Sequence, residues 1–176
     1  MELFLVLILT CIICAGVPIL AFGYINGKIK FPNQKAPNTE KSNRTVLRWM
    51  VFILGTFLGC FLFPAYNITK NYGHHIQWNR LFLVIAECYV MGSILAKAFP
   101  YEKESVTKTV FSLLGFNCVF ILAGMGCRYL LEFGEVSNTY NFTAPNIVVH
   151  LLTVNVFCMA SWYFGVKQEQ NRKRQG

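Results

Sequence analysis

Apolar and polar residues follow one another along this chain in long blocks, without the short period of an amphipathic soluble helix or strand. The apolar blocks cover residues 3–24, 49–66, 81–96, 110–133 and 147–166. A helix rises about 1.5 Å per residue, so a block of about 20 apolar residues crosses a hydrocarbon core of roughly 30 Å. The pattern predicts an all-α fold: one polytopic domain, 1–176, built as an integral membrane bundle of five transmembrane helices.

Charge in the polar segments predicts the orientation of these spans. Segment 25–48 is the most basic, and Pro32 and Pro37 within it predict a loop without helix. The segments 97–109 and 167–176 are also basic, whereas 67–80 and 134–146 are not. Because Lys and Arg collect on the cytoplasmic side, we expect the N-terminus outside and the C-terminus inside. The first block lacks a basic leader and a clear cleavage site, so we expect an uncleaved anchor.

Composition agrees with a membrane protein, since 55% of the residues are hydrophobic and 14% are charged. The formal charge of +8 fits basic loops facing an anionic leaflet better than nucleic-acid binding, because no nucleic-acid module is left over. The expected partners are the lipid bilayer, a lipid headgroup, and a membrane protein partner or a second copy of the chain. Nucleic acid is not among them.

Glu87, Arg128 and His150 are ionisable residues inside the apolar blocks, where charge is costly and side chains usually face the bundle interior. Glu87, Arg128 and His150 all lie in the outer half of their predicted spans, below the loop that carries His74 and His75. One hypothesis is that they converge with the two histidines on a polar pocket open to the non-cytoplasmic side, with Glu87 as proton acceptor or metal ligand and Arg128 as anion or headgroup anchor. The alternative is a structural Glu87–Arg128 ion pair below solvated histidines.

Two further motifs have a physical meaning in a membrane protein. Gly55 and Gly59 form a GxxxG pattern, which lets helix backbones approach closely, either within the chain or between two copies. Asn141 begins an Asn-Phe-Thr sequon and is the candidate for N-linked glycosylation.

Catalytic motifs are absent from the sequence. It contains no Asp, no GxSxG, no Walker signature and no HExxH, and no histidine pair is spaced to bracket a haem. We therefore expect no catalytic residue, no metal and no cofactor, and favour a protein that is not an enzyme.

The order of landmarks resembles the DRAM-like family of multi-pass membrane proteins, which includes autophagy modulators and GPI-anchor lipid-remodelling proteins. The landmarks are the basic 28–48 loop, Leu54-Gly55 with Gly59, Asn67, His75, the 97–108 hairpin, and the run Ala160-Ser-Trp162-Tyr-Phe164-Gly165-Val-Lys167. The resemblance implies a secretory-pathway or endolysosomal protein that acts in lipid handling or trafficking.

The function expected from these observations is non-enzymatic binding of lipid or a partner subunit, in membrane trafficking or lipid handling. One alternative is a small transporter or channel subunit, for which Asn117 and Asn155 are the deep polar residues. Another is a membrane-embedded lipid-modifying or redox enzyme. We expect an endomembrane (Golgi, ER or lysosome) or the plasma membrane, with a bacterial inner membrane as the alternative location.

Overall fold

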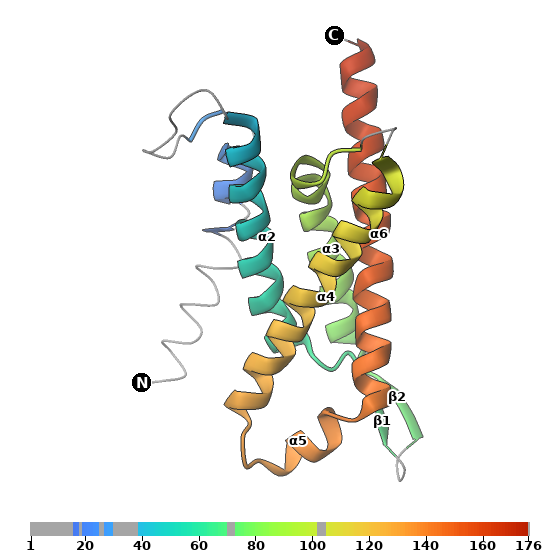
Figure 1. Ribbon diagram of the computed structural model, residues 1–176. Helices are drawn as coiled ribbons and strands as arrows, with labels where there is room; N and C mark the ends of the chain where they lie inside the picture. The colour runs from blue at the N-terminus through green and yellow to red at the C-terminus, as the bar shows by residue number, and fades with distance from the viewer. Residues whose placement is uncertain are drawn as a thin grey trace.

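Long apolar helices form the body of the molecule (Figure 1). The computed structural model describes residues 16–17, 19–24, 27–29, 39–69, 73–101 and 105–175. Four helices of this described part are long and apolar enough to cross a membrane: α2 (Thr39–Leu62), α3 (Trp78–Ala98), α4 (Val106–Leu131) and α6 (Ala144–Gln175). They confirm the prediction of a helical integral membrane protein. Most of the predicted first span, 3–24, lies outside the described residues, although 19–24 are helical.

Helix α2 differs at both ends from the predicted span 49–66. It begins at Thr39, inside the segment expected to be a loop, because its first turns follow the last proline, Pro37, and contain a Glu40–Arg44 ion pair of 2.7 Å one turn apart. It ends at Leu62, because Pro64 lacks an N–H and restricts the residue before it.

The polar segments expected to be loops also contain structure. Strands β1 (Tyr66–Thr69) and β2 (Gly73–Ile76) form an antiparallel hairpin in which Tyr66 faces Ile76. A short helix, α5 (Val136–Asn141), lies between α4 and α6. Helix α6 continues to Gln175, well beyond the predicted end at 166, because the tail is rich in Gln, Lys, Arg and Glu and has no proline.

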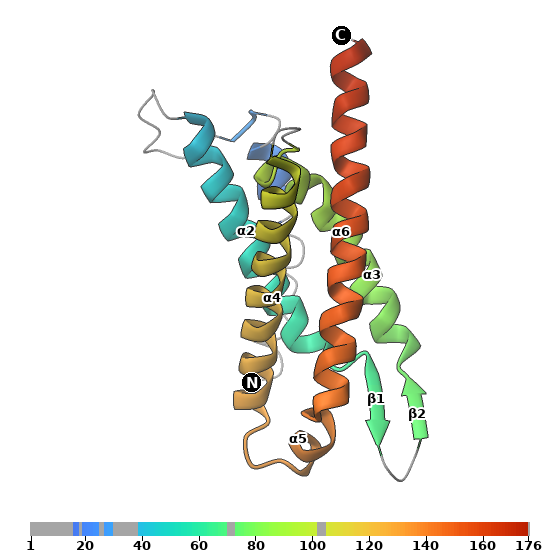
Figure 2. The same ribbon diagram turned by 45° about the vertical axis from the view of Figure 1, so that its right-hand side comes forward.

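Successive long helices run in opposite directions, so α2 runs parallel to α4, and α3 runs parallel to α6 (Figures 1 and 2). The largest helix contact is between α3 and α6, followed by those of α2 with α4 and with α3. The last turns of α6 extend past the ends of the other helices, and the hairpin lies at the opposite end of the molecule.

Glycines bring α2 and α4 together. A Cβ placed on Gly124 of α4 would lie 2.7 Å from the Thr56 carbonyl oxygen, and one on Gly55 would lie 2.6 Å from the Phe120 ring. Gly59 faces Gly124, with 3.9 Å between its ideal Cβ position and the Gly124 Cα. Gly55 and Gly59 therefore contact a helix of their own chain.

Small residues also set the contact between α3 and α6. A Cβ on Gly92 would lie 2.7 Å from the Ser161 Cβ, and one on Gly165 would lie 2.8 Å from the Gly92 carbonyl oxygen and 3.0 Å from the Ala96 Cβ. Each helix thus contributes two small residues four positions apart, the spacing that lets membrane helices pack at close range.

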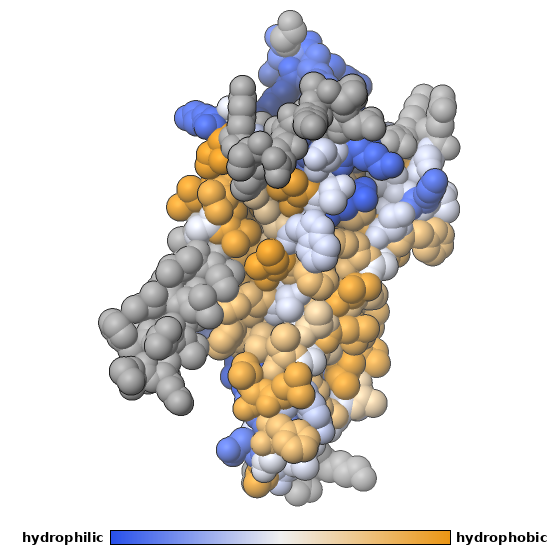
Figure 3. Space-filling model, turned by 60° about the vertical axis from the view of Figure 1, so that its left-hand side comes forward, coloured by the Kyte–Doolittle hydropathy of each residue, from blue (hydrophilic) through white to orange (hydrophobic). Residues whose placement is uncertain are grey.

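The outer surface of the long helices is apolar, as the space-filling view shows over the middle of one face (Figure 3). Large side chains such as Phe82, Phe111, Leu130 and Leu152 are more than half exposed. A soluble monomer rarely exposes apolar patches of this extent, so hydrocarbon is the solvent that suits this surface.

We expect Gly92→Leu to destabilise the bundle, because a side chain there overlaps the Ser161 backbone and cannot be relieved by a rotamer change. The loss should be about 1–3 kcal/mol or more, measured by thermal unfolding in mild detergent. Gly115→Leu is the matched control, since nothing lies within 4 Å of a Cβ on Gly115. Equal stability of the two variants would contradict the close α3–α6 contact.

Candidate functional site

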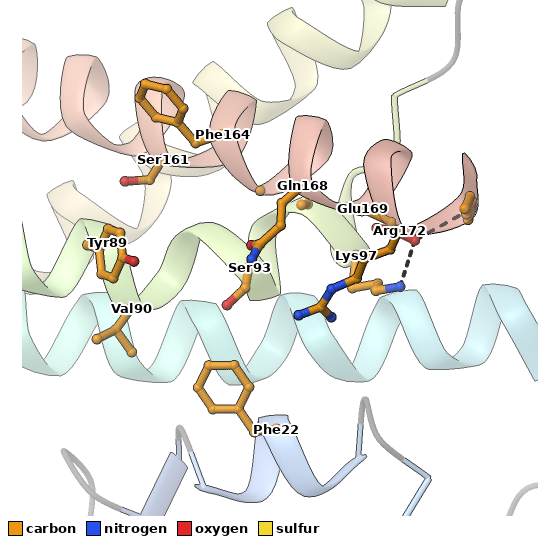
Figure 4. A pocket seen from close by; sticks show the side chains of 13 residues that line it. Phe22, Tyr89, Val90, Ser93, Lys97, Ser161, Phe164, Gln168, Glu169 and Arg172 are labelled. Carbon is orange, nitrogen blue, oxygen red and sulfur yellow. Dashed lines mark hydrogen bonds and ion pairs between the residues drawn. The ribbon is translucent and has the colours of Figure 1, made fainter. Parts of the chain in front are cut away.

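A cavity of about 910 Å³ lies between α3 and α6, toward the end at which α6 finishes (Figure 4). Phe22, from the helical residues 19–24, faces the two helices across it. The lining residues on α3 are Tyr89, Val90, Ser93, Ala96 and Lys97, and those on α6 are Ser161, Phe164, Gly165, Gln168, Glu169, Arg172 and Lys173.

The cavity follows from the sequence of the two helices. Its residues on α6 recur every three or four positions, which places them on one face of the helix. Ser93, Ala96, Ser161 and Gly165 are all small, so their side chains leave the space between the helices unfilled. The residues that allow the close helix contact therefore also hollow out its edge.

Polarity changes along the cavity. Phe164 lies at the level of aromatic and aliphatic residues, whereas Arg172, eight positions later, lies among charged ones. At the helical rise this change takes place over about 12 Å. The apolar group is Phe22, Tyr89, Val90 and Phe164, and the charged group is Lys97, Glu169, Arg172 and Lys173. The cavity has the polarity of one half of a bilayer, from hydrocarbon to headgroup.

The three ionisable residues predicted to form an outer pocket each have different contacts in the structure. Glu87 is buried on the inner face of α3, and His150 is buried on α6 with its ring edge-on to Phe63, 5.2 Å between centroids. Arg128 forms an ion pair with Glu132, one turn later on the same helix end. Among the described residues no ion pair joins Glu87 to Arg128, so the alternative prediction of that pair is wrong.

The remaining predicted residues lie at the hairpin end. His74 and His75 belong to β2, where their backbones pair with Ile68 and Asn67. Asn141 is the last residue of α5, and its side-chain nitrogen, the atom that a glycan would occupy, donates to Glu132 Oε2 at 3.3 Å.

Arginine side chains at this end bind the carbonyl groups where α2 stops. Arg128 donates to the Cys60 oxygen at 3.5 Å, and Arg80 donates to the Phe63 and Pro64 oxygens at 3.2 and 3.4 Å. Sequence reasoning missed Arg80, although its place at the start of a span was a signal for such a role. These contacts satisfy acceptors that a helix end otherwise leaves unpaired.

The carbonyl groups at the C-terminal end of α3, on the other side of the bundle, also accept hydrogen bonds from side chains of neighbouring helices. Trp162 Nε1 donates to the Phe99 oxygen at 2.7 Å, and Arg48 Nε donates to the Ala98 oxygen at 3.2 Å. The Arg48 guanidinium also lies 4.4 Å from the centroid of the Phe99 ring, a cation–π contact. Trp162 thereby links α3 to α6 next to the cavity.

Two asparagines in the bundle interior have incomplete hydrogen bonding. Asn117 is fully buried on α4, and neither its side-chain oxygen nor its nitrogen has a partner within the described structure. Asn155 donates to the Leu151 oxygen at 2.9 Å and contacts Cys118 Sγ at 3.6 Å, but its oxygen is unpaired there. Buried polar atoms of this kind are costly in a membrane protein.

Neither a metal nor a relative indicates the chemistry of the site. Over the described ranges no three His, Cys, Asp or Glu side chains come together in a way that could hold a metal ion. No family model, curated protein or solved structure matches the chain. The function is therefore argued from the geometry of the cavity.

The Glu132 carboxylate predicts a pH dependence of stability. Burial would raise its pKa, but the hydrogen bond and charge of Arg128, with hydrogen bonds from Asn141 and Ser137, hold the pKa below its ordinary value of 4.5. A depressed folded pKa means that the ionised group stabilises the fold above the unfolded pKa and that this contribution is lost as pH falls through the folded pKa. Thermal unfolding in detergent should therefore shift to lower temperature as pH falls below about 4.5.

Glu132→Gln should reduce this acid-induced shift, because the variant has no carboxylate to protonate. Glu135→Gln, which removes an exposed carboxylate three residues away, is the control and should retain it. If the unfolding temperature fell with pH equally in wild type and Glu132→Gln, the attribution of the shift to the Glu132 carboxylate would be wrong.

Proposed function

We propose that this chain is a non-enzymatic membrane protein that binds a lipid in the cavity between α3 and α6. The observation that carries the proposal is the polarity of the lining, which passes from Tyr89 and Phe164 to Lys97 and Arg172 along the helix axes. An amphiphile aligned with the surrounding bilayer lipids has the same order of apolar and polar parts. The cavity volume of about 910 Å³ is within the range of small-molecule sites.

The depth of the cavity supports this reading. The hydrocarbon core needs about 20 residues of helix, so if α6 enters at its first turn, near residue 146, it leaves near residue 166. Phe164 then lies at the edge of the hydrocarbon, and Arg172 lies about 9 Å further out, in the headgroup layer. Tyr89 and Val90 lie deeper, on α3, where acyl chains would contact them.

The proposed topology is five spans with the N-terminus outside and the C-terminus inside. Basic residues gather at the end of the bundle that holds the start of α2 and the finish of α6, including Lys41, Arg44 and Lys97. By the positive-inside rule this end, and the cavity with it, faces the cytoplasm. The resemblance in landmark order to DRAM-like proteins agrees with lipid handling in an endomembrane or the plasma membrane.

Filling the cavity tests the proposal. We expect Ser93→Phe to lower the amount of lipid retained by the purified protein by about tenfold, equivalent to about 1.4 kcal/mol, because a ring there occupies the space next to Gln168. Lipid retained per protein would be measured by native mass spectrometry after purification in mild detergent.

Ser112→Phe is the matched control, since Ser112 is exposed on α4 and does not line the cavity. It should retain lipid as the wild type does. Undiminished lipid in Ser93→Phe, or an equal loss in both variants, would contradict binding in this cavity.

A second candidate function is a small transporter or channel subunit. The unpaired side-chain atoms of Asn117 and Asn155 favour it, because water or a polar solute would satisfy them. In vesicles containing the protein, flux of small ions or solutes should fall severalfold in Asn117→Leu if this function is correct. Flux that equals that of empty vesicles would exclude it.

A further inference from the structure

The charged end of the cavity contains one acidic and three basic side chains, and they are not equivalent. Glu169 accepts a hydrogen bond from Lys97 Nζ at 2.6 Å and forms an ion pair with Lys173 Nζ at 3.6 Å. Within the described part of the chain Arg172 has no ion-pair partner, although it lines the same cavity. The Glu169 carboxylate thus pairs with the ammonium groups of Lys97 and Lys173, and the Arg172 guanidinium remains without a carboxylate partner among the described residues.

The Arg172 side chain points into the cavity, so its positive charge is available to a ligand there. Figure 4 shows Gln168 and Arg172 reaching from α6 toward Ser93 of α3. Guanidinium, amide and hydroxyl groups are all hydrogen-bond donors, and Glu169 is already engaged by Lys97. A group that fits between them carries negative charge and several acceptor oxygens. The planar guanidinium fork matches phosphate or carboxylate in two hydrogen bonds.

The opposite end of the cavity identifies what carries the anion. Phe22, Tyr89 and Phe164 offer apolar surface that a free phosphate or a soluble anion would leave uncovered. Tyr89 and Phe164 are 79% and 66% exposed, so an acyl chain in the bilayer can lie against them directly. Basic pockets between helices on the cytoplasmic side suit anionic lipid headgroups.

Resting on the lipid-binding function above, we infer that the α3–α6 cavity selects a lipid with an anionic phosphate headgroup and that Arg172 is the residue that recognises it. Gln168 and Ser93 add hydrogen bonds to the headgroup, and the Lys97–Glu169–Lys173 group forms the rim. Selectivity against zwitterionic lipid arises because its ammonium group would meet the unpaired positive charge of Arg172.

The test compares phosphatidylglycerol with phosphatidylcholine of the same acyl chains, each titrated into the delipidated full chain in detergent and followed by native mass spectrometry. We expect phosphatidylglycerol to bind wild type about tenfold more tightly than phosphatidylcholine, and Arg172→Gln to abolish the difference. Arg172→Lys keeps the charge but loses the planar fork, so its preference for phosphatidylglycerol should lie between those of wild type and Arg172→Gln. Arg174→Gln is the control, because it removes the same charge from the same helix outside the cavity lining.

Each contrary result has a distinct meaning. Equal binding of the two lipids, or an equal loss in Arg172→Gln and Arg174→Gln, overturns the headgroup assignment while leaving lipid binding intact. Displacement of phosphatidylglycerol by millimolar inorganic phosphate overturns it in favour of a free-anion site. Failure of Ser93→Phe to reduce binding of either lipid overturns the underlying proposed function.

Discussion

The carbonyl groups at helix ends impose the main constraint on this structure, because the last C=O groups of a helix have no partner within the helix and are costly where they are buried. Side chains from neighbouring helices donate hydrogen bonds to these carbonyl groups. Arg80 and Arg128 bind the end of α2, Arg48 and Trp162 bind the end of α3, and Asn138 donates to the Glu132 oxygen at 2.6 Å where α4 stops. These polar contacts tie each helix end to a neighbouring segment, and the small residues let the helices pack at close range.

The same two requirements produce the cavity. Close packing at Gly92, Ser161 and Gly165 removes bulk from one edge of the α3–α6 contact, while Trp162, on the buried face of α6, holds the two helices together through Phe99. The extension of α6 beyond the other helices then adds charged residues above an apolar hollow. A binding site of graded polarity is thus a consequence of how two parallel helices pack and of how far one of them continues.

Sequence patterns predicted the membrane class and the positions of α2, α3, α4 and α6, because hydrocarbon thickness sets a length that apolar blocks must match. They missed the first turns of α2 and the tail of α6, since polar helix outside the membrane has no hydropathy signal. They placed Glu87, Arg128 and His150 at similar depths, but depth along a span gives no information about which face of its helix a residue occupies. The α3–α6 cavity depends on two helices far apart in sequence, and no sequence pattern predicted it.

The measurement that tests the central claim most directly is an experimental density map of the full chain in nanodiscs that contain both zwitterionic and anionic phospholipid. We predict elongated density along α3 and α6, beginning beside Tyr89 and Phe164 and ending in a compact feature within hydrogen-bonding distance of the Arg172 guanidinium. A cavity closed by side chains, or a lipid headgroup lying at the hairpin end beside Arg128 instead, would contradict it.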